Sequence, residues 1–131
     1  DGVLLLPGCC DPFNEKAVRA GRSACFQIRI VSGTWAHLKT LEQALGMTML
    51  AGHPATAREE EEGNPLITAT LSKHFADSVV DTPLCLVLGS EGSGISASAH
   101  EACRLVAIPM NGEFESLNVS VAGGIFMYML Q

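Results

Sequence analysis

The chain has 131 residues, 47% of them hydrophobic, which is enough for one compact domain with a core and too few for two ordinary ones. Its apolar runs are far shorter than the roughly 18 residues of a membrane-spanning helix, and no signal-like start is present, so we expect a soluble intracellular protein, in the cytoplasm or in an organelle. The net charge of −6 argues against a protein that binds nucleic acid over its whole surface.

The first half of the chain alternates short apolar runs with helical patterns. The run at residues 3–6, ended by a Pro-Gly pair, is typical of a strand buried on both faces of a parallel sheet. Asp11 or Asn14 can cap a helix over residues 15–20, and Gly21 is placed to end it. A second strand at residues 26–31 would complete a βαβ-like unit.

The middle of the chain continues the alternation. Three leucines at helical spacing predict an amphipathic helix over residues 35–45, followed by Gly46 and a strand over residues 47–51. Residues 52–65 contain a run of four glutamates, whose mutual repulsion favours a solvated loop. Residues 66–71 are ambiguous between strand and loop, and a short helical turn is predicted over residues 71–75.

The last third carries the clearest strand, at residues 84–88, followed by a glycine-rich loop over residues 89–94. A helix over residues 96–104 and a strand over residues 105–108 come next. The final helix, over residues 119–130, is apolar nearly all round, so it must be covered by its own sheet or by a second subunit.

Cysteine and histidine show no metal-site spacing. The five cysteines are odd in number and form no CxxC pair, so reduced thiols are favoured over a disulfide framework or a metal site. The histidines are predicted to be surface or core residues and not metal ligands; they are His37, His53, His74 and His100.

The glycine-rich loop follows a strand and precedes a helix, which is how α/β proteins present backbone amides to a nucleotide. It is not a phosphate-binding P-loop, because Ile95 and Ser96 stand where that motif needs Lys and then Ser or Thr. Glu91 within the loop would repel phosphate, which points to a ligand without phosphates such as S-adenosylmethionine. A plain tight turn explains the same composition.

A second polar cluster follows the strand at residues 105–108. Ser116 and Asn118 stand at the start of the last helix, where they can cap it. The alternative is that they face a ligand at the carboxyl ends of the strands, where open α/β folds bind ligands.

These two clusters resemble a known family. Residues 86–96, Leu-Val-Leu-Gly-Ser-Glu-Gly-Ser-Gly-Ile-Ser, are similar to the second motif of SpoU/TrmH methyltransferases, and Ile108-Pro109-Met110 with residues 116–122 is similar to the third. The resemblance runs from about Gly2 to the end. It implies an α/β fold, with a mostly parallel sheet, helices on both faces and a C-terminal trefoil knot, an exception to the rule that chains avoid knots.

The same resemblance implies one methyltransferase domain over residues 1–131, truncated at its N-terminus so that the first motif of the family precedes Asp1. It also implies a homodimer, formed through the knot and the C-terminal helix. The implied function is S-adenosylmethionine-dependent 2′-O-methylation of ribose in ribosomal or transfer RNA. The sequence leaves two alternatives: an inactive methyltransferase-like scaffold in ribosome or complex assembly, and an α/β domain whose glycine loop holds phosphate.

The family motifs assign roles to particular positions. The implied reaction-site residues are Glu91, Ser116 and Asn118. The implied cofactor-binding residues, acting largely through backbone groups, are Leu88, Gly89, Gly92, Ile108, Met110 and Leu117. RNA contacts are expected at Arg19 and Arg22, in a segment that with Lys16 concentrates three of the eight basic residues.

Overall fold

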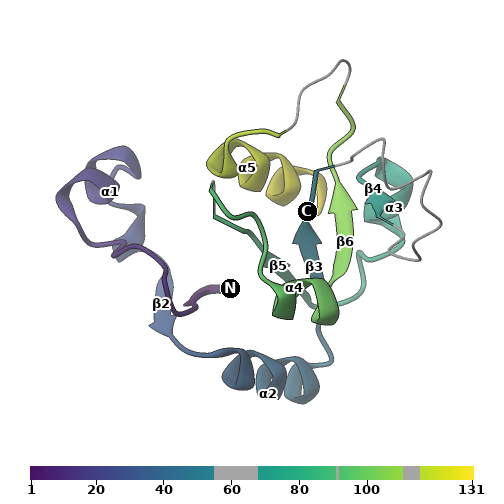
Figure 1. Cartoon of the computed structure of the whole chain (residues 1–131), viewed down its shortest axis with the longest axis horizontal. Coiled ribbons are helices and arrows are strands. Elements are labelled where there is room, and N and C mark those ends of the chain that lie inside the picture. The colour runs from purple at the N-terminus through teal and green to yellow at the C-terminus, as the bar shows by residue number, and fades with distance from the viewer. Residues whose placement is uncertain (55–67, 91, 111–115) are drawn as a thin grey trace. The chain divides into compact units, whose positions relative to one another are not determined.

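A computed structural model describes residues 1–54, 68–90, 92–110 and 116–131. The chain forms two compact units, Asp1–Ala44 and Leu45–Gln131, which are described separately (Figure 1). Within the described ranges, no helix combines the length and the apolar character needed to cross a bilayer.

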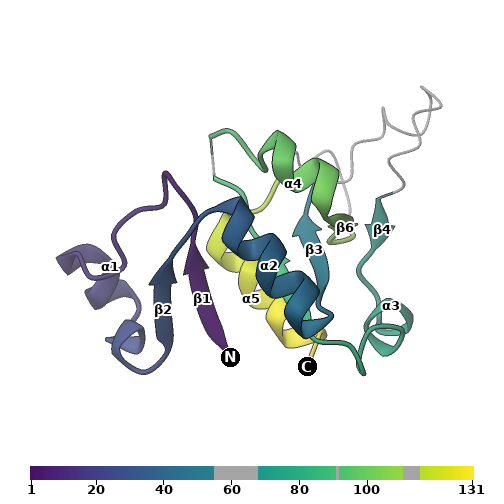
Figure 2. The same cartoon turned by 90° about the horizontal axis from the view of Figure 1, so that it is seen from below.

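The first unit is built on a parallel strand pair (Figure 2). Its elements are β1 (Gly2–Leu5), α1 (Glu15–Ala20), the 3-10 helix η1 (Ala24–Phe26), β2 (Arg29–Ser32) and α2 (Trp35–Leu45), whose last residue opens the second unit. Asn14 caps α1 by accepting a hydrogen bond from the backbone N–H of Ala17 at 3.0 Å. Because β1 and β2 pair in parallel and α1 lies between them in the chain, the predicted βαβ unit is confirmed.

Two predictions in this unit are wrong. Phe26 does not begin a strand: Ser23 adopts a left-handed backbone with φ of 64°, and its carbonyl accepts the N–H of Phe26, so the chain turns before β2. The apolar run at residues 3–6 is not buried on both faces, because the described sheet around it has two strands and leaves Val3 and Val31 exposed.

The second unit contains a four-stranded, all-parallel sheet in the order β4-β6-β3-β5 (Figure 1). Its strands are β3 (Thr48–Gly52), β4 (Ala69–Thr70), β5 (Leu84–Val87) and β6 (Arg104–Ala107). Its helices are α3 (Lys73–Asp77), α4 (Ala97–Ala102) and α5 (Val119–Met129). The predicted parallel α/β arrangement is confirmed.

The boundary between α4 and β6 differs from the prediction. Arg104 opens β6 and does not belong to the preceding helix, because Cys103 already has an extended backbone. The Arg104 guanidinium lies 4.7 Å from the centre of the Phe75 ring, which gives this charged residue of β6 an aromatic partner on α3.

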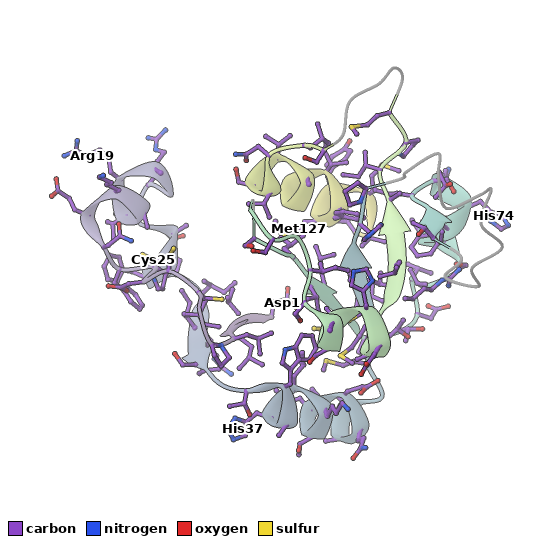
Figure 3. All side chains as sticks on the ribbon, in the orientation of Figure 1. Asp1, Arg19, Cys25, His37, His74 and Met127 are labelled. Atoms are coloured by element: carbon purple, nitrogen blue, oxygen red, sulfur yellow. The ribbon has the colours of Figure 1, made fainter. Side chains whose placement is uncertain are left out.

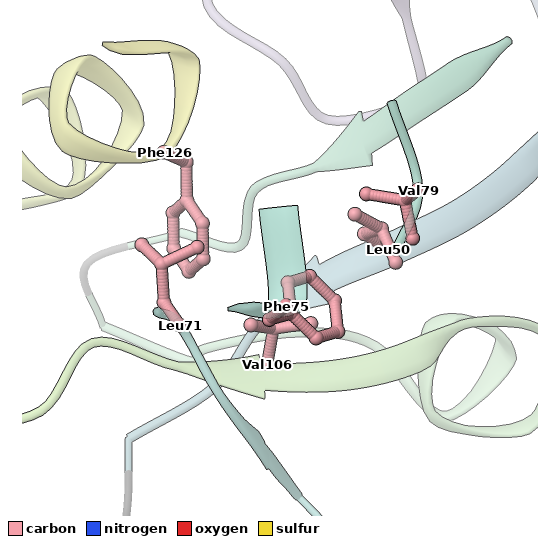
Figure 4. Close-up of a cluster of buried hydrophobic side chains, with 6 residues drawn as sticks. All are labelled: Leu50, Leu71, Phe75, Val79, Val106 and Phe126. Carbon is pink, nitrogen blue, oxygen red and sulfur yellow. The ribbon is translucent and has the colours of Figure 1, made fainter. Parts of the chain in front are cut away.

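Helices lie on both faces of the four-stranded sheet. Neighbouring residues of a strand point to opposite faces. A Cβ added at Gly52 would lie 2.8 Å from the Phe126 ring of α5, whereas the ring of His53, the next residue, stacks edge-on against His100 of α4. The core on the α5 side consists of six buried side chains (Figure 4), which are Leu50, Leu71, Phe75, Val79, Val106 and Phe126.

Candidate functional site

A cavity of about 420 Å³ lies at the carboxyl ends of β3, β5 and β6, within the second unit. Its volume falls in the range of small-molecule sites, and its place is where open parallel sheets bind ligands. The described residues that line it are Gly52, His53, Pro54, Leu88, Gly89, Ser90, Ser93, Gly94, Ile95, His100, Ile108, Met110, Ser116, Leu117, Val119, Ala122 and Phe126.

The loop after β5 forms one wall of the cavity and closes on itself. Ser90 and Gly94 exchange two backbone hydrogen bonds of 2.9 Å, and the Ser90 hydroxyl accepts the N–H of Ser93 at 3.1 Å. Gly89 packs so tightly against the end of this loop that a Cβ there would lie 2.3 Å from the carbonyl carbon and oxygen of Gly94. Only glycine fits, and the backbone at Gly89 is left open to a ligand.

The opposite wall is α5, which approaches the strand ends closely. A Cβ at Gly123 would lie 2.8 Å from Leu88 Cδ1, and a Cβ at Gly52 would lie 2.8 Å from the Phe126 ring. The absence of these two side chains lets α5 sit directly on the ends of β3 and β5. The cavity therefore depends on residues that are far apart in the sequence.

Asn118 begins α5 as its N-cap. Its side-chain oxygen accepts the backbone N–H groups of Ser120, at 3.0 Å, and of Val121, at 3.4 Å. The neighbouring Ser116 and Leu117 line the cavity, whereas Asn118 does not. The predicted capping role of Asn118 is confirmed.

We expect Asn118→Ala to lower the free energy of unfolding by about 1 kcal/mol, because it removes the acceptor for two free N–H groups of the helix. Asn118→Asp, which keeps a capping oxygen, serves as the control and should stay within about 0.5 kcal/mol of the native protein. Equilibrium unfolding in urea measures both. Equal losses in the two variants would contradict the capping role.

The described lining of the cavity holds no Asp, Glu, Lys or Arg. Its only ionisable side chains in that part of the chain are His53 and His100, whose rings are 5.2 Å apart, centre to centre. Nδ1 of His53 is buried without a hydrogen-bond partner among the described residues. An unsatisfied buried nitrogen costs about 1–3 kcal/mol, and a bound ligand or a water molecule commonly completes such a site.

The cavity gathers most of the residues implied by the family motifs. It brings together Leu88, Gly89, Ile108, Met110, Ser116 and Leu117 from both sequence clusters. Gly92 does not line it, and Glu91 lies outside the described residues. Sequence reasoning missed His53 and His100, since neither belongs to a motif and only the packing of α4 on β3 brings them together.

Arg19 and Arg22 belong to the first unit, on a shallow surface that Phe13 and Phe26 also line. Arg19 forms an ion pair of 2.9 Å with Glu15, and both side chains are more than four-fifths exposed. Such a pair stabilises the fold very little, so Arg19 remains available to a partner.

The chain also matches known proteins. The profile of the SpoU rRNA Methylase family matches residues 1–128. The 23S rRNA (guanosine-2′-O-)-methyltransferase RlmB of Nitrosomonas europaea is 33% identical, over 96% of this chain and 54% of that protein. The 23S rRNA (guanosine(2553)-2′-O)-methyltransferase RlmP of Bacillus subtilis is 30% identical, over the whole chain and 47% of that protein. The chain thus spans about half the length of these relatives.

Solved structures share the fold. The SpoU methyltransferase AviRb from Streptomyces viridochromogenes, in complex with AdoMet, has a TM-score of 0.77 at 19% identity, over 98% of this chain and 48% of that one. The AdoMet-bound rRNA methyltransferase from Sinorhizobium meliloti has a TM-score of 0.73 at 22% identity, over 98% and 44%. On the family profile and these relatives, the chain belongs to the SpoU rRNA methylase family.

Proposed function

We propose that this protein uses S-adenosylmethionine to methylate the ribose 2′-oxygen of a ribosomal or transfer RNA. The observation that carries the proposal is the single cavity that both family motifs line, with Gly89 on one side and Ile108 and Leu117 on the other. Relatives named as rRNA 2′-O-methyltransferases, which match nearly the whole chain, support it.

The residues present fit S-adenosylmethionine. Gly89 lines the cavity at a position where any side chain would collide with Gly94, and no described lining residue is the Lys or Arg that a phosphate chain would need. When bound, S-adenosylmethionine supplies an electrophilic methyl group on a sulfonium. Leu88, Gly89, Gly92, Ile108, Met110 and Leu117 are the residues that we propose hold it.

The remaining roles concern the RNA. We propose that Ser116 hydrogen-bonds the ribose or the cofactor at the mouth of the cavity, with Glu91 and Asn118 as further reaction-site residues. Such groups lower the barrier mainly by fixing the reacting oxygen in line and by helping its proton to leave. Arg19 and Arg22 are proposed to bind RNA phosphates, which would concentrate positive charge locally on an acidic chain.

The assembly is also a proposal. We propose that residues 1–131 form part of one methyltransferase domain, that its C-terminal segment threads a trefoil knot, and that the protein is a homodimer. The apolar residues exposed on α5 support a second subunit there; they are Val121, Met127 and Tyr128. The intracellular location expected from the sequence stays a prediction.

The first test is ligand choice. We expect isothermal titration to show S-adenosylhomocysteine binding at least about tenfold more tightly than ATP, because no cation in the described lining offsets the charge of a triphosphate. Preferential ATP binding would contradict the proposal and favour a phosphate-holding domain.

The second test is methyl transfer from labelled S-adenosylmethionine to ribosomal and transfer RNA, assayed with the complete protein. Incorporation at a ribose 2′-oxygen would support the proposed reaction. Cofactor binding without transfer to either class of RNA would favour the inactive scaffold.

A further inference from the structure

The two histidines of the cavity form a pair that no family motif contains. His53 follows the last residue of β3, and its backbone N–H donates to the Val106 carbonyl at 3.0 Å, which fixes its position beside β6. His100 lies on α4, with its ring 5.2 Å from that of His53 and inclined at 74°. Both side chains line the cavity.

From this pair we infer that His53 and His100 set the preference of the cavity between the cationic methyl donor and its neutral product. The inference rests on the proposed function. S-adenosylmethionine carries one net positive charge, from its sulfonium, whereas S-adenosylhomocysteine carries none. In a cavity whose described lining contains no other ionisable side chain, a proton gained by the pair would repel the donor and leave the product almost unaffected.

A comparison of the two compounds isolates the effect of the sulfonium charge. Adenine, ribose, carboxylate and ammonium are common to the two compounds, so their interactions and their own titrations largely cancel in the ratio of the two affinities. Only the sulfonium charge differs. Histidine is the side-chain type whose charge changes near neutral pH, and a proton held by either of these rings, whose centres are 5.2 Å apart, would place a positive charge at the cavity.

Other charged groups near the pair do not offer the same response. Glu101, next to His100 on α4, is exposed, and Arg104 at the start of β6 lies over the Phe75 ring. The described residues of α5 and of the loop after β5 contribute only uncharged side chains to the cavity. Carboxylates and guanidinium groups also keep their charge above about pH 5.5.

The experiment is a titration of the purified protein with each compound at pH 8.0, 7.0, 6.0 and 5.5, at constant ionic strength. We expect the ratio of the dissociation constants, donor over product, to rise about three- to tenfold as the pH falls, which is the scale for unit charges roughly 10 Å apart at moderate screening. The double variant His53→Gln and His100→Gln, which keeps polar side chains without a titrating ring, should give a flat ratio.

His74 provides the matched control. It is exposed on α3 in the same unit (Figure 3) and is not among the residues that line the cavity, so His74→Gln should keep the full pH response. A flat ratio in the native protein, or an unchanged response in the double variant, would overturn the inference. If both compounds bind but with parallel pH dependence, only this inference is lost. If neither binds at any pH, the proposed function falls with it.

Discussion

Replacing Gly89 with alanine is expected to lower the affinity for S-adenosylhomocysteine by about a hundredfold, equivalent to roughly 2.7 kcal/mol. The added Cβ would lie 2.3 Å from the Gly94 carbonyl group and 2.6 Å from the backbone nitrogen of Ile95. These are backbone atoms, so they give way only if the loop opens and the paired hydrogen bonds between Ser90 and Gly94 break. Isothermal titration of the variant measures the loss.

Gly92, in the same loop, is the matched comparison. A Cβ at Gly92 would meet no atom within 4 Å. Because this Cβ leaves in place the backbone of Gly92, which is the part proposed to hold the ligand, we expect Gly92→Ala to reduce the affinity by less than about fivefold, a change of under 1 kcal/mol. If the two variants bind equally well, or if Gly89→Ala binds like the native protein, the loop after β5 is not the ligand wall that we propose.

Leu50→Ala should reduce the free energy of unfolding by about 3 kcal/mol. Leu50 is completely buried at the centre of β3 and belongs to the hydrophobic cluster shared by α3, β6 and α5. Shortening it removes apolar contact and leaves a void that a strand paired on both sides closes poorly. Because the free energy of unfolding of domains of this size is only about 5–15 kcal/mol, equilibrium unfolding in urea should readily detect this decrease.

Val80→Ala provides the contrast. Val80 is 60% exposed, although the preceding Val79 is buried in the same cluster. Shortening this side chain should reduce the free energy of unfolding by less than about 0.5 kcal/mol. A cost below about 1 kcal/mol for Leu50→Ala would show that β3 is not the centre of the core.

Local signals in the sequence predicted most elements well. The helix at residues 35–45 and its terminal glycine are as expected, because leucine spacing and the positive φ of Gly46 are strictly local properties. The turn at Phe26 was missed because it depends on left-handed backbone at Arg22 and Ser23, two residues that rarely adopt it. The exposure of β1 was missed because burial depends on which strands neighbour it.

The site was predictable only where it follows a motif. The loop at Gly89 and the segment at Leu117 were predicted to line the site because their glycine and polar patterns resemble the motifs of the family. His53 and His100 lie 47 positions apart in the numbering and meet only because α4 packs on β3. No sequence pattern links these two residues, so only the structure shows that both line the cavity.

The seating of α5 on Gly52 and Leu88 has a consequence for biosynthesis. Phe126 completes a cavity whose other lining residues all precede it in the chain. A nascent polypeptide halted after β6 has emerged but before Phe126 leaves the ribosome would hold the sheet yet lack the binding site. The protein should therefore acquire its ligand only after translation of this helix, and stalled chains bearing the whole sheet should show no protection by S-adenosylhomocysteine against proteolysis.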